Sequence, residues 1–254
     1  MAKNKINIPM FQDLLKKSTL NYSIDNVGMV FKKDTFKVGM KGDNSILIIK
    51  GANDCISGIA ETDEWALNFN GPVKNVKAYF DLAVPDDNEE ASITMKDEKM
   101  IMQAGNQKSQ MFFCSSHLIS GFEGDGPKIE GDTVCEFSLN DTFMDAYNVI
   151  KKVAGSFGKV YFTVEDNILY IQATDMTNSF ANGLKIEIGE SEFDDVNVCL
   201  DFKTLNNIMV ILNGDYLDFT FRIGYVKRSD GGLISFIKGD GTEKYYQLSQ
   251  IENL

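Results

Sequence analysis

One order of expected elements occurs twice along the sequence, and this repetition restricts the possible folds more than any other feature. A strand is followed by a helix, about three strands, a short helix and a hairpin-rich run of strands, once before residue 117 and again after residue 133. We therefore predict a duplicated chain, with a first domain at 1–116 and a second at 134–254. The residues between, 117–133, are rich in glycine and acidic side chains and too irregular for a strand, which predicts an interdomain linker.

Two anchors set the register of the repeat. The pattern F-x-D occurs in the first helical segment of each copy, at Phe11 and at Phe143, and Gly105 aligns with Gly239 near the end of each copy. Most of the remaining sequence consists of short runs in which apolar and polar residues alternate, such as VGMVFK, ILYIQA and YLDFTFRI. Alternation with a period of two predicts antiparallel strands.

Four segments instead show the 3.6-residue period of an amphipathic helix. They are Pro9–Ser18, Pro72–Phe80, Leu139–Ala154 and Asp201–Leu212. Ser138 and Asp141 match a capping box for the third segment, and Gly155 is expected to end it, while Asp201 is expected to cap the fourth. The predicted fold class is α+β, with two duplicated domains that each contain antiparallel sheets and two helices.

The composition restricts the expected cellular location of the protein and the kinds of chemical site that it can form. The 254 residues are 43% hydrophobic, without 18 consecutive apolar residues or a recognisable signal peptide, so we expect a soluble cytoplasmic protein with no membrane association. The four cysteines lie far apart without a C-x-x-C pair, and His117 is the single histidine. These features predict reduced cysteines, no metal site and no cofactor. The acidic linker also lacks the loop pattern of an EF-hand calcium site, which favours a solvated connector.

An enzyme is one alternative interpretation. The segment GSFGKV, Gly155–Val160, resembles a phosphate-binding loop, but residue 153 is valine and no serine or threonine follows the lysine. No Ser-His or Cys-His combination is apparent for nucleophilic catalysis. We therefore expect no catalytic residues and no enzymatic activity.

Lysines occur on the polar faces of all four predicted helices, although the chain has a formal net charge of −12. On a single helix such lysines are most simply solubilising residues, but their presence on four helices from two copies favours a shared function. None of these four helices combines arginine with asparagine or glutamine, the residues that read base edges. Such a surface therefore suits sequence-independent contacts with phosphates. The candidate DNA-facing residues are Lys16, Lys17, Lys74, Lys77, Lys151, Lys152 and Lys203.

The chain resembles the DNA polymerase sliding clamps of the proliferating cell nuclear antigen (PCNA) type and the related clamps of large DNA phages. The resemblance rests on the duplicated α+β halves, the central linker, the acidic composition and the ending KYYQLSQIE, Lys244–Glu252. The stretch DDNEEASITMKDEKMIMQAGNQKSQMFF is similar to the phage clamps in particular. The resemblance implies a closed homotrimeric ring that encircles double-stranded DNA and tethers a DNA polymerase. It also implies a clamp loader as partner and, if a phage encodes the protein, the host cytoplasm as location.

The resemblance further implies two protein-binding regions. The ring is expected to close between an edge at Gln110–Ser115 and an edge at Phe180–Ile188. The implied subunit-interface residues are Met111, Phe112, Phe113, Phe180 and Leu184. Partner peptides are expected to insert apolar side chains under the linker, in a pocket formed by Met40, Ile119, Phe122, Ile129, Tyr246, Leu248 and Ile251. Core packing is an equally good interpretation of Tyr246 and Leu248.

A second alternative is a structural component of a virion or phage tail, because acidic β-rich chains with duplicated domains also build such assemblies. The two interpretations differ in the helix lysines, which only a clamp needs on one side of a channel. Copurification with a polymerase or with particles distinguishes them.

Overall fold

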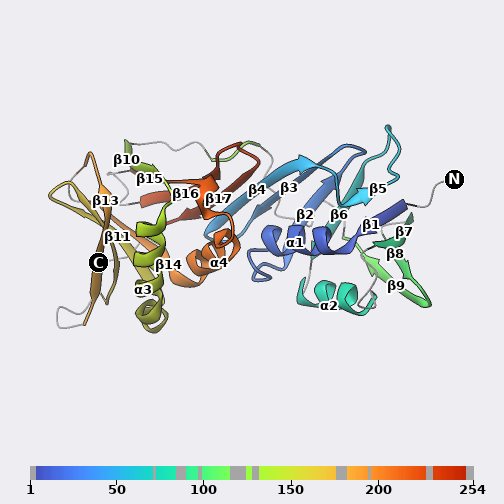
Figure 1. The fold of residues 1–254 in the computed structure, drawn as a ribbon, viewed down its shortest axis with the longest axis horizontal. Coiled ribbons are helices and arrows are strands. Elements are labelled where there is room, and N and C mark those ends of the chain that lie inside the picture. Colours follow the sequence, from blue (N-terminus) through green and yellow to red (C-terminus); the bar gives the residue numbers. More distant parts are fainter. Residues whose placement is uncertain are drawn as a thin grey trace. The chain divides into compact units, whose positions relative to one another are not determined.

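The structure is a computed structural model that describes residues 4–70, 73–83, 90–96, 99–114, 124–127, 132–175, 182–193, 196–226 and 231–249 (Figure 1). The chain divides into two compact units. Unit 1 comprises Met1–Gly42 and Leu47–Asp125, and unit 2 comprises Asp43–Ile46 and Gly126–Leu254. The division between Asp125 and Gly126 falls within the segment that the sequence predicts as a linker.

The first half of the chain contains nine strands and two helices among its described residues. In chain order they are β1 (Asn4–Asn7), α1 (Ile8–Ser18), β2 (Asn26–Phe31), β3 (Thr35–Lys41), β4 (Ser45–Ala52), β5 (Ile56–Ser57), β6 (Trp65–Asn70), α2 (Val73–Ala83), β7 (Glu90–Lys96), β8 (Lys99–Ala104) and β9 (Gln107–Phe112). One sheet has the strand order β5-β1-β7-β8-β9, and β4, β3, β2 and β6 are neighbours in that order in another. The pairs in the five-stranded sheet are antiparallel.

The second half repeats this plan. Its elements are β10 (Asp132–Ser138), α3 (Asp141–Phe157), β11 (Lys159–Glu165), β12 (Ile168–Ala173), β13 (Leu184–Glu190), β14 (Asn197–Asp201), α4 (Phe202–Leu212), the 3-10 helix η2 (Tyr216–Asp218), β15 (Phe219–Val226), β16 (Gly231–Lys238) and β17 (Glu243–Leu248). Strands β10, β15, β16 and β17 are neighbours in that order, and β13, β12, β11 and β14 form a four-stranded sheet. The element orders of the halves match, except that η2 and the short strand β5 have no described counterpart. This confirms the predicted duplication and the α+β class.

Aromatic side chains form the centre of each unit. In unit 1, the ring of Phe11 on α1 lies 4.9 Å from that of Phe80 on α2 and 6.1 Å from that of Phe31 on β2. In unit 2, the ring of Phe221 on β15 lies between 5.0 and 5.4 Å from four other phenylalanine rings. Those four are Phe137, Phe143, Phe162 and Phe236. Helices α1 and α3 therefore bury their apolar stripes against the strands of their own units, and α2 packs against α1.

The structure corrects two expectations about α3. Ser138 and Asp141 do not form the predicted capping box, because the side chain of Asn140 caps the helix and accepts a 3.0 Å hydrogen bond from the Phe143 N–H. Gly155 lies inside the helix, which ends at Gly158 in the left-handed conformation with φ of 70°. A glycine near an exposed helix end costs little, whereas the left-handed position requires a residue without Cβ strain. The predicted cap of α4 is confirmed, since Asp201 accepts a 2.7 Å bond from the Thr204 N–H.

The other helix boundaries differ from the sequence prediction by a few residues. Helix α1 begins at Ile8, one residue before Pro9, with Asn7 as its cap, and α2 extends to Ala83 rather than Phe80. Within the described residues, no helix is both long enough and apolar enough to cross a membrane.

Candidate nucleic-acid and partner surfaces

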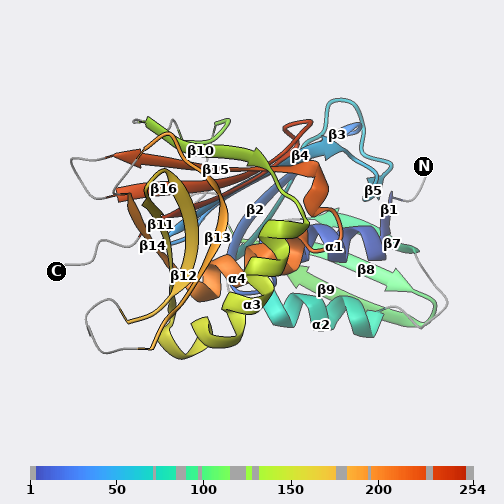
Figure 2. The same ribbon diagram turned by 60° about the vertical axis from the view of Figure 1, so that its left-hand side comes forward.

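Helices α3 and α4 pack against each other in unit 2 (Figures 1 and 2). They carry three exposed lysines. Lys151 and Lys152 lie in the second half of α3, and Lys203 lies in the first turn of α4. The Lys151 ammonium is 5.8 Å from the centroid of the Tyr147 ring. The predicted lysines of unit 2 are therefore available to solvent on two neighbouring helices.

A partly buried hydrogen bond links α3 to α4. The hydroxyl of Tyr147, on α3, donates to Asn206 Oδ1, on α4, over 2.8 Å. Burial raises the pKa of Tyr147 above its ordinary value, so the hydroxyl remains a neutral donor at physiological pH. This contact could not be predicted from the sequence, because a tyrosine in an apolar stripe predicts only that the residue is buried.

The charge on α3 is not uniform along its length. Asp141 and Asp145 are exposed in its first half, and the Asp141 carboxylate accepts a hydrogen bond from the hydroxyl of Tyr216 in η2. This bond to Asp141 raises the pKa of Tyr216. A carboxylate in the first turn also interacts favourably with the helix dipole. The positive part of α3 is thus its second half, around Lys151 and Lys152.

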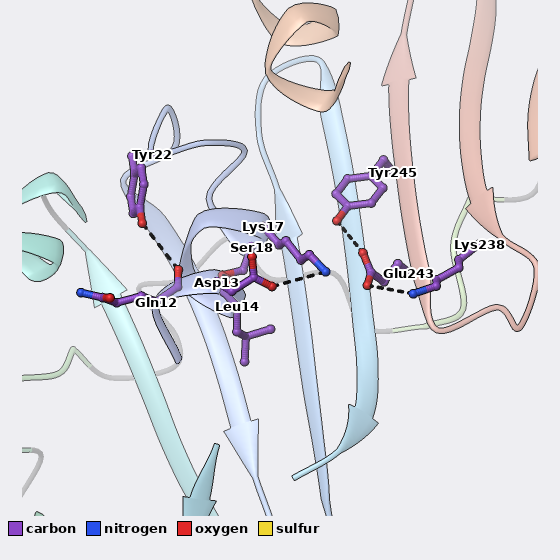
Figure 3. A network of polar contacts seen from close by, with 9 residues as sticks. All are labelled: Gln12, Asp13, Leu14, Lys17, Ser18, Tyr22, Lys238, Glu243 and Tyr245. Atoms are coloured by element: carbon purple, nitrogen blue, oxygen red, sulfur yellow. Dashed lines mark hydrogen bonds and ion pairs between the residues drawn. The ribbon is translucent and has the colours of Figure 1, made fainter. Parts of the chain in front are cut away.

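The lysines of α1 and α2 differ in their exposure to solvent. Lys74 on α2 is exposed, whereas Lys77 on α2 and both lysines of α1, Lys16 and Lys17, are partly buried. Lys17 forms an ion pair of 3.4 Å with Asp13, one turn earlier on α1 (Figure 3). The Asp13 carboxylate therefore partly offsets the charge of Lys17. Among the seven predicted DNA-facing residues, Lys74, Lys151, Lys152 and Lys203 offer the most accessible charge.

Most of the residues predicted to form the peptide pocket are either buried or outside the residues that the structure describes. Ile119, Phe122, Ile129 and Ile251 lie outside the described residues. Met40 is buried in unit 1, and Tyr246 is buried in unit 2. Leu248 is partly exposed, and its N–H donates to the Asn44 carbonyl over 2.9 Å.

The described part of the linker passes directly over Tyr246. Gly126 adopts a φ of 120°, and a Cβ atom added to it would lie 2.8 Å from Tyr246 Cζ. This approach leaves room only for glycine. The resemblance to sliding clamps implies a pocket that includes both Tyr246 and the linker, and Gly126 is a described linker residue that lies against the tyrosine.

The strand that is expected at the subunit interface begins and ends three residues earlier than predicted. Strand β9 spans Gln107–Phe112 rather than Gln110–Ser115 and lies at the edge of its sheet. Met111 and Phe113 point into unit 1 and are buried, while Phe112 is 68% exposed, with the Lys99 ammonium 6.0 Å from its ring centroid. Alternation along an extended segment explains this division, since neighbouring side chains point to opposite faces.

The second predicted interface strand is also an edge. Strand β13 spans Leu184–Glu190 and ends the order β13-β12-β11-β14. Leu184 is partly buried, and Phe180 lies outside the described residues. Both strands for which the resemblance implies a sheet edge therefore lie at an edge, and Phe112 is a large exposed apolar side chain on β9.

Metal-binding side chains do not gather in the part of the chain that the structure describes. No group of three or more histidine, cysteine, aspartate or glutamate side chains there is arranged to hold a metal ion. Burial raises the pKa of Cys55 to about 11 and that of Cys135 to about 12. Both thiols are therefore protonated and weakly nucleophilic near neutral pH.

Comparison with known proteins identifies the fold. No protein-family model matches the sequence, and no curated protein matches it. Among solved structures, DNA polymerase III subunit beta from Pseudomonas aeruginosa superposes with a TM-score of 0.66 at 13% identity, over 99% of this chain and 67% of that chain. The DNA polymerase sliding clamp from Bacillus subtilis gives 0.65 at 13% identity, over 99% and 64%.

An archaeal protein matches from end to end. Archaeoglobus fulgidus PCNA, in a structure with the C-terminal region of FEN-1 bound, superposes with a TM-score of 0.64 at 10% identity over 100% of both chains. This chain spans about two thirds of the bacterial chains and the full length of the archaeal one. The protein therefore has the sliding-clamp fold. The alternative of a virion or tail component receives no support from these similar structures.

Proposed function

We propose that the protein is a DNA sliding clamp that encircles duplex DNA and acts as a processivity factor for a DNA polymerase. The observation that carries this proposal is the end-to-end match of both units to a PCNA chain. The lysines on the helices add a chemical reason, because exposed ammonium groups without base-reading partners suit contacts with phosphates. A clamp needs no catalytic residue, since it keeps the polymerase on DNA by topology.

The ring forms from three copies joined edge to edge. Each chain offers β9 at one sheet edge and β13 at another, and no strand covers the outer side of either among the described residues. A contact between two different edges is heterologous, so repeating it around an axis closes a ring if the rotation fits. Main-chain hydrogen bonds between edges supply the joint, and the exposed ring of Phe112 supplies apolar burial.

DNA passes through this ring with weak contacts. Lysines of the helices face the duplex, and only part of them touch phosphates at one time. For about 3 to 6 neutralised phosphates, log K falls with log salt at a slope of about −3 to −5. Such contacts retain the duplex electrostatically and allow sliding, because they do not depend on base sequence.

Partner proteins, including the polymerase and a clamp loader, bind by short peptides with apolar side chains. The candidate pocket includes Leu248 and Tyr246, and Gly126 of the linker covers the tyrosine. The structure with a bound FEN-1 C-terminal region supports a peptide of this kind, since that archaeal relative in fold is bound by a segment of another protein. A peptide that reaches Tyr246 must first displace the linker at Gly126.

The lysine proposal is tested with adjacent double substitutions. Lys151→Ala with Lys152→Ala should reduce the salt slope of binding to short duplex by about 1 to 2 and shorten primer-extension products at rising salt. Lys32→Ala with Lys33→Ala is the matched control, because these adjacent exposed lysines pair with Glu64 and Glu61 in unit 1. Extension reactions contain the polymerase and loader of the same replication system. Equal behaviour of the two double variants contradicts the DNA-facing assignment.

The ring proposal is tested by sedimentation. The parent should sediment as a compact trimer at micromolar concentration, and Phe112→Asp should yield monomers because it buries an unpaired charge in the joint. Leu217→Asp is the matched control, since Leu217 is 65% exposed on η2. A monomeric parent, or a trimeric Phe112→Asp variant, overturns the proposed joint.

A further inference from the structure

The outer edge of the first strand is paired with another strand in unit 1 but not among the described residues of unit 2. In unit 1, β5 pairs with β1 through Lys5↔Ser57 and Ile6↔Ile56 (Figure 1). The Asn7 N–H also donates to the Cys55 carbonyl over 2.8 Å. In unit 2, the equivalent strand β10 ends the order β10-β15-β16-β17. No strand pairs with its other side among the described residues.

The backbone of β10 presents hydrogen-bonding groups to this open side. The Leu139 N–H donates to the Phe219 carbonyl over 2.8 Å, and Phe137 pairs with Phe221 in the same register. In an antiparallel pair, alternate residues bond to the same neighbour. The N–H and C=O groups of Glu136 and Ser138 therefore point away from β15.

One point of this edge is already occupied. The register shifts at a bulge between Thr133 and Cys135, and the Val134 carbonyl accepts a 3.0 Å hydrogen bond from the Ser191 hydroxyl. Bulges commonly limit pairing along an edge strand. The segment from Glu136 to Ser138 lies past the bulge and is the part available for pairing.

A groove runs beside the same edge. Its volume is about 530 Å³, with Thr133–Glu136 on one side and Glu190–Glu192 on the other. Arg222 lies 3.5 Å from the Glu136 carboxylate and offsets its charge, whereas Glu190 and Glu192 are both exposed. The rim is thus acidic overall, which favours an occupant with positive side chains.

We propose that the open edge of β10 binds an extended basic segment of a partner protein as an added strand. Strand addition gives affinity through main-chain hydrogen bonds, and the acidic rim selects the side chains. Unit 1 provides the internal precedent, since β5 occupies the corresponding edge of β1. The site shares only Glu190, the last residue of β13, with the two edges proposed for the ring joint, and none of the peptide-pocket residues, so it goes beyond the proposed clamp function.

The groove is a binding site rather than a reactive one. Cys135 is its only thiol among the lining residues, and burial raises its pKa to about 12. The thiol therefore stays protonated near neutral pH and is a poor nucleophile. Recognition by backbone pairing and charge is the chemistry that these residues offer.

The probe for this site is an end-blocked heptapeptide of alternating lysine and valine, added to the full-length protein without DNA. Amide hydrogen exchange should slow at Glu136 and Ser138 when the peptide binds. A heptapeptide of alternating glutamate and valine is the control and should bind at least several-fold more weakly. No added protection at these two amides with millimolar lysine peptide, or equal binding of the acidic peptide, overturns the proposal.

Protein variants separate backbone pairing from charge. Glu136→Pro removes one outward N–H and should weaken binding of the lysine peptide by up to tenfold. Glu136→Gln keeps that N–H and should weaken binding by less than threefold. Glu190→Lys with Glu192→Lys leaves β10 unchanged and should weaken binding several-fold. Unchanged affinity in both Glu136→Pro and the double variant contradicts the site. Since no DNA or polymerase is present, this result is independent of the clamp function.

Discussion

The two units share one topology but differ in how their elements end. Helix α3 has 17 residues, an acidic first turn and a left-handed glycine at its C-cap. Helix α1 has 11 residues, no acidic residue in its first turn and, beyond its end, three consecutive non-glycine residues with positive φ, Leu20–Tyr22. The common order of strands and helices therefore depends on the buried apolar pattern, whereas the ends of elements can vary between copies.

The cores of the units differ in how many rings meet. Phe221 contacts four other phenylalanine rings in unit 2, and Phe11 contacts two in unit 1. The sole tryptophan, Trp65, belongs to β6 of unit 1. Its fluorescence therefore reports the unfolding of unit 1, while circular dichroism reports both units. This allows each substitution below to be assigned to one half.

Removing a central ring should have the largest effect. Phe221→Ala and Phe11→Ala should each destabilise their own unit by about 3–5 kcal/mol, because each leaves a cavity at a fully buried position. Phe221→Ala should shift the denaturation seen by circular dichroism more than that seen by Trp65 fluorescence. Phe11→Ala should shift the fluorescence transition directly. If both variants shift both signals equally, the units unfold as one cooperative body and the comparison of separate cores fails.

Much of the fold could be predicted because apolar periodicity determines which face of each element is buried. The four helices and the duplicated strand order follow from that pattern. The ends of α3 could not be predicted from it. Ser138, Asn140 and Asp141 are all good capping residues, and the backbone conformation determines which of them caps the helix. Gly155 and Gly158 are similarly ambiguous, since a sequence does not state which glycine adopts positive φ.

The candidate surfaces were predicted less completely. Lysine positions follow from the helix period, but the ion pair of Lys17 with Asp13 and the partial burial of Lys77 depend on packing. The run Met111–Phe113 reads as three apolar residues in sequence, whereas alternation exposes only Phe112. No sequence pattern predicted the open edge of β10. The edge is open because, among the described residues, no strand lies beside β10 as β5 lies beside β1.

The linker contact should give the next largest effect. Gly126→Ala should destabilise unit 2 by about 1–3 kcal/mol, because the new Cβ meets the buried Tyr246 ring at a backbone φ of 120°. Gly105→Ala is the control in unit 1, where φ is 55° and nothing lies within 4 Å of an added Cβ. It should cost about 1 kcal/mol through backbone strain alone. Urea denaturation measures both, and a smaller loss for Gly126→Ala means that the linker does not pack on Tyr246.

The helix caps provide a matched pair of smaller effects. Asn7 and Asn140 each accept a hydrogen bond from the N–H three residues later, over 3.1 and 3.0 Å. Replacing either with alanine should cost about 1 kcal/mol. The loss should be no larger for Asn140, because Asp141 still places a negative charge in the first turn of α3. A negligible loss for Asn7→Ala, followed by Trp65 fluorescence, would show that α1 does not depend on this cap.

The smallest expected effect concerns the positive-φ residues that distinguish the ends of the elements. Asn21 has a φ of 57° after α1, and Asn167 has a φ of 63° in the turn between β11 and β12. Asn21→Gly should stabilise unit 1 by about 0.5 kcal/mol, because relief of left-handed strain slightly exceeds the entropy cost of glycine. Asn167→Gly gains the same relief but loses the 3.2 Å bond from its side-chain amide to the Ser191 carbonyl, so it should be neutral or destabilising. Opposite shifts of the urea midpoints, in Trp65 fluorescence for Asn21→Gly and in circular dichroism for Asn167→Gly, support this distinction. A gain in both variants would mean that the Asn167 side chain contributes nothing, and a loss in both would mean that the turn after α1 is held by its neighbours without strain.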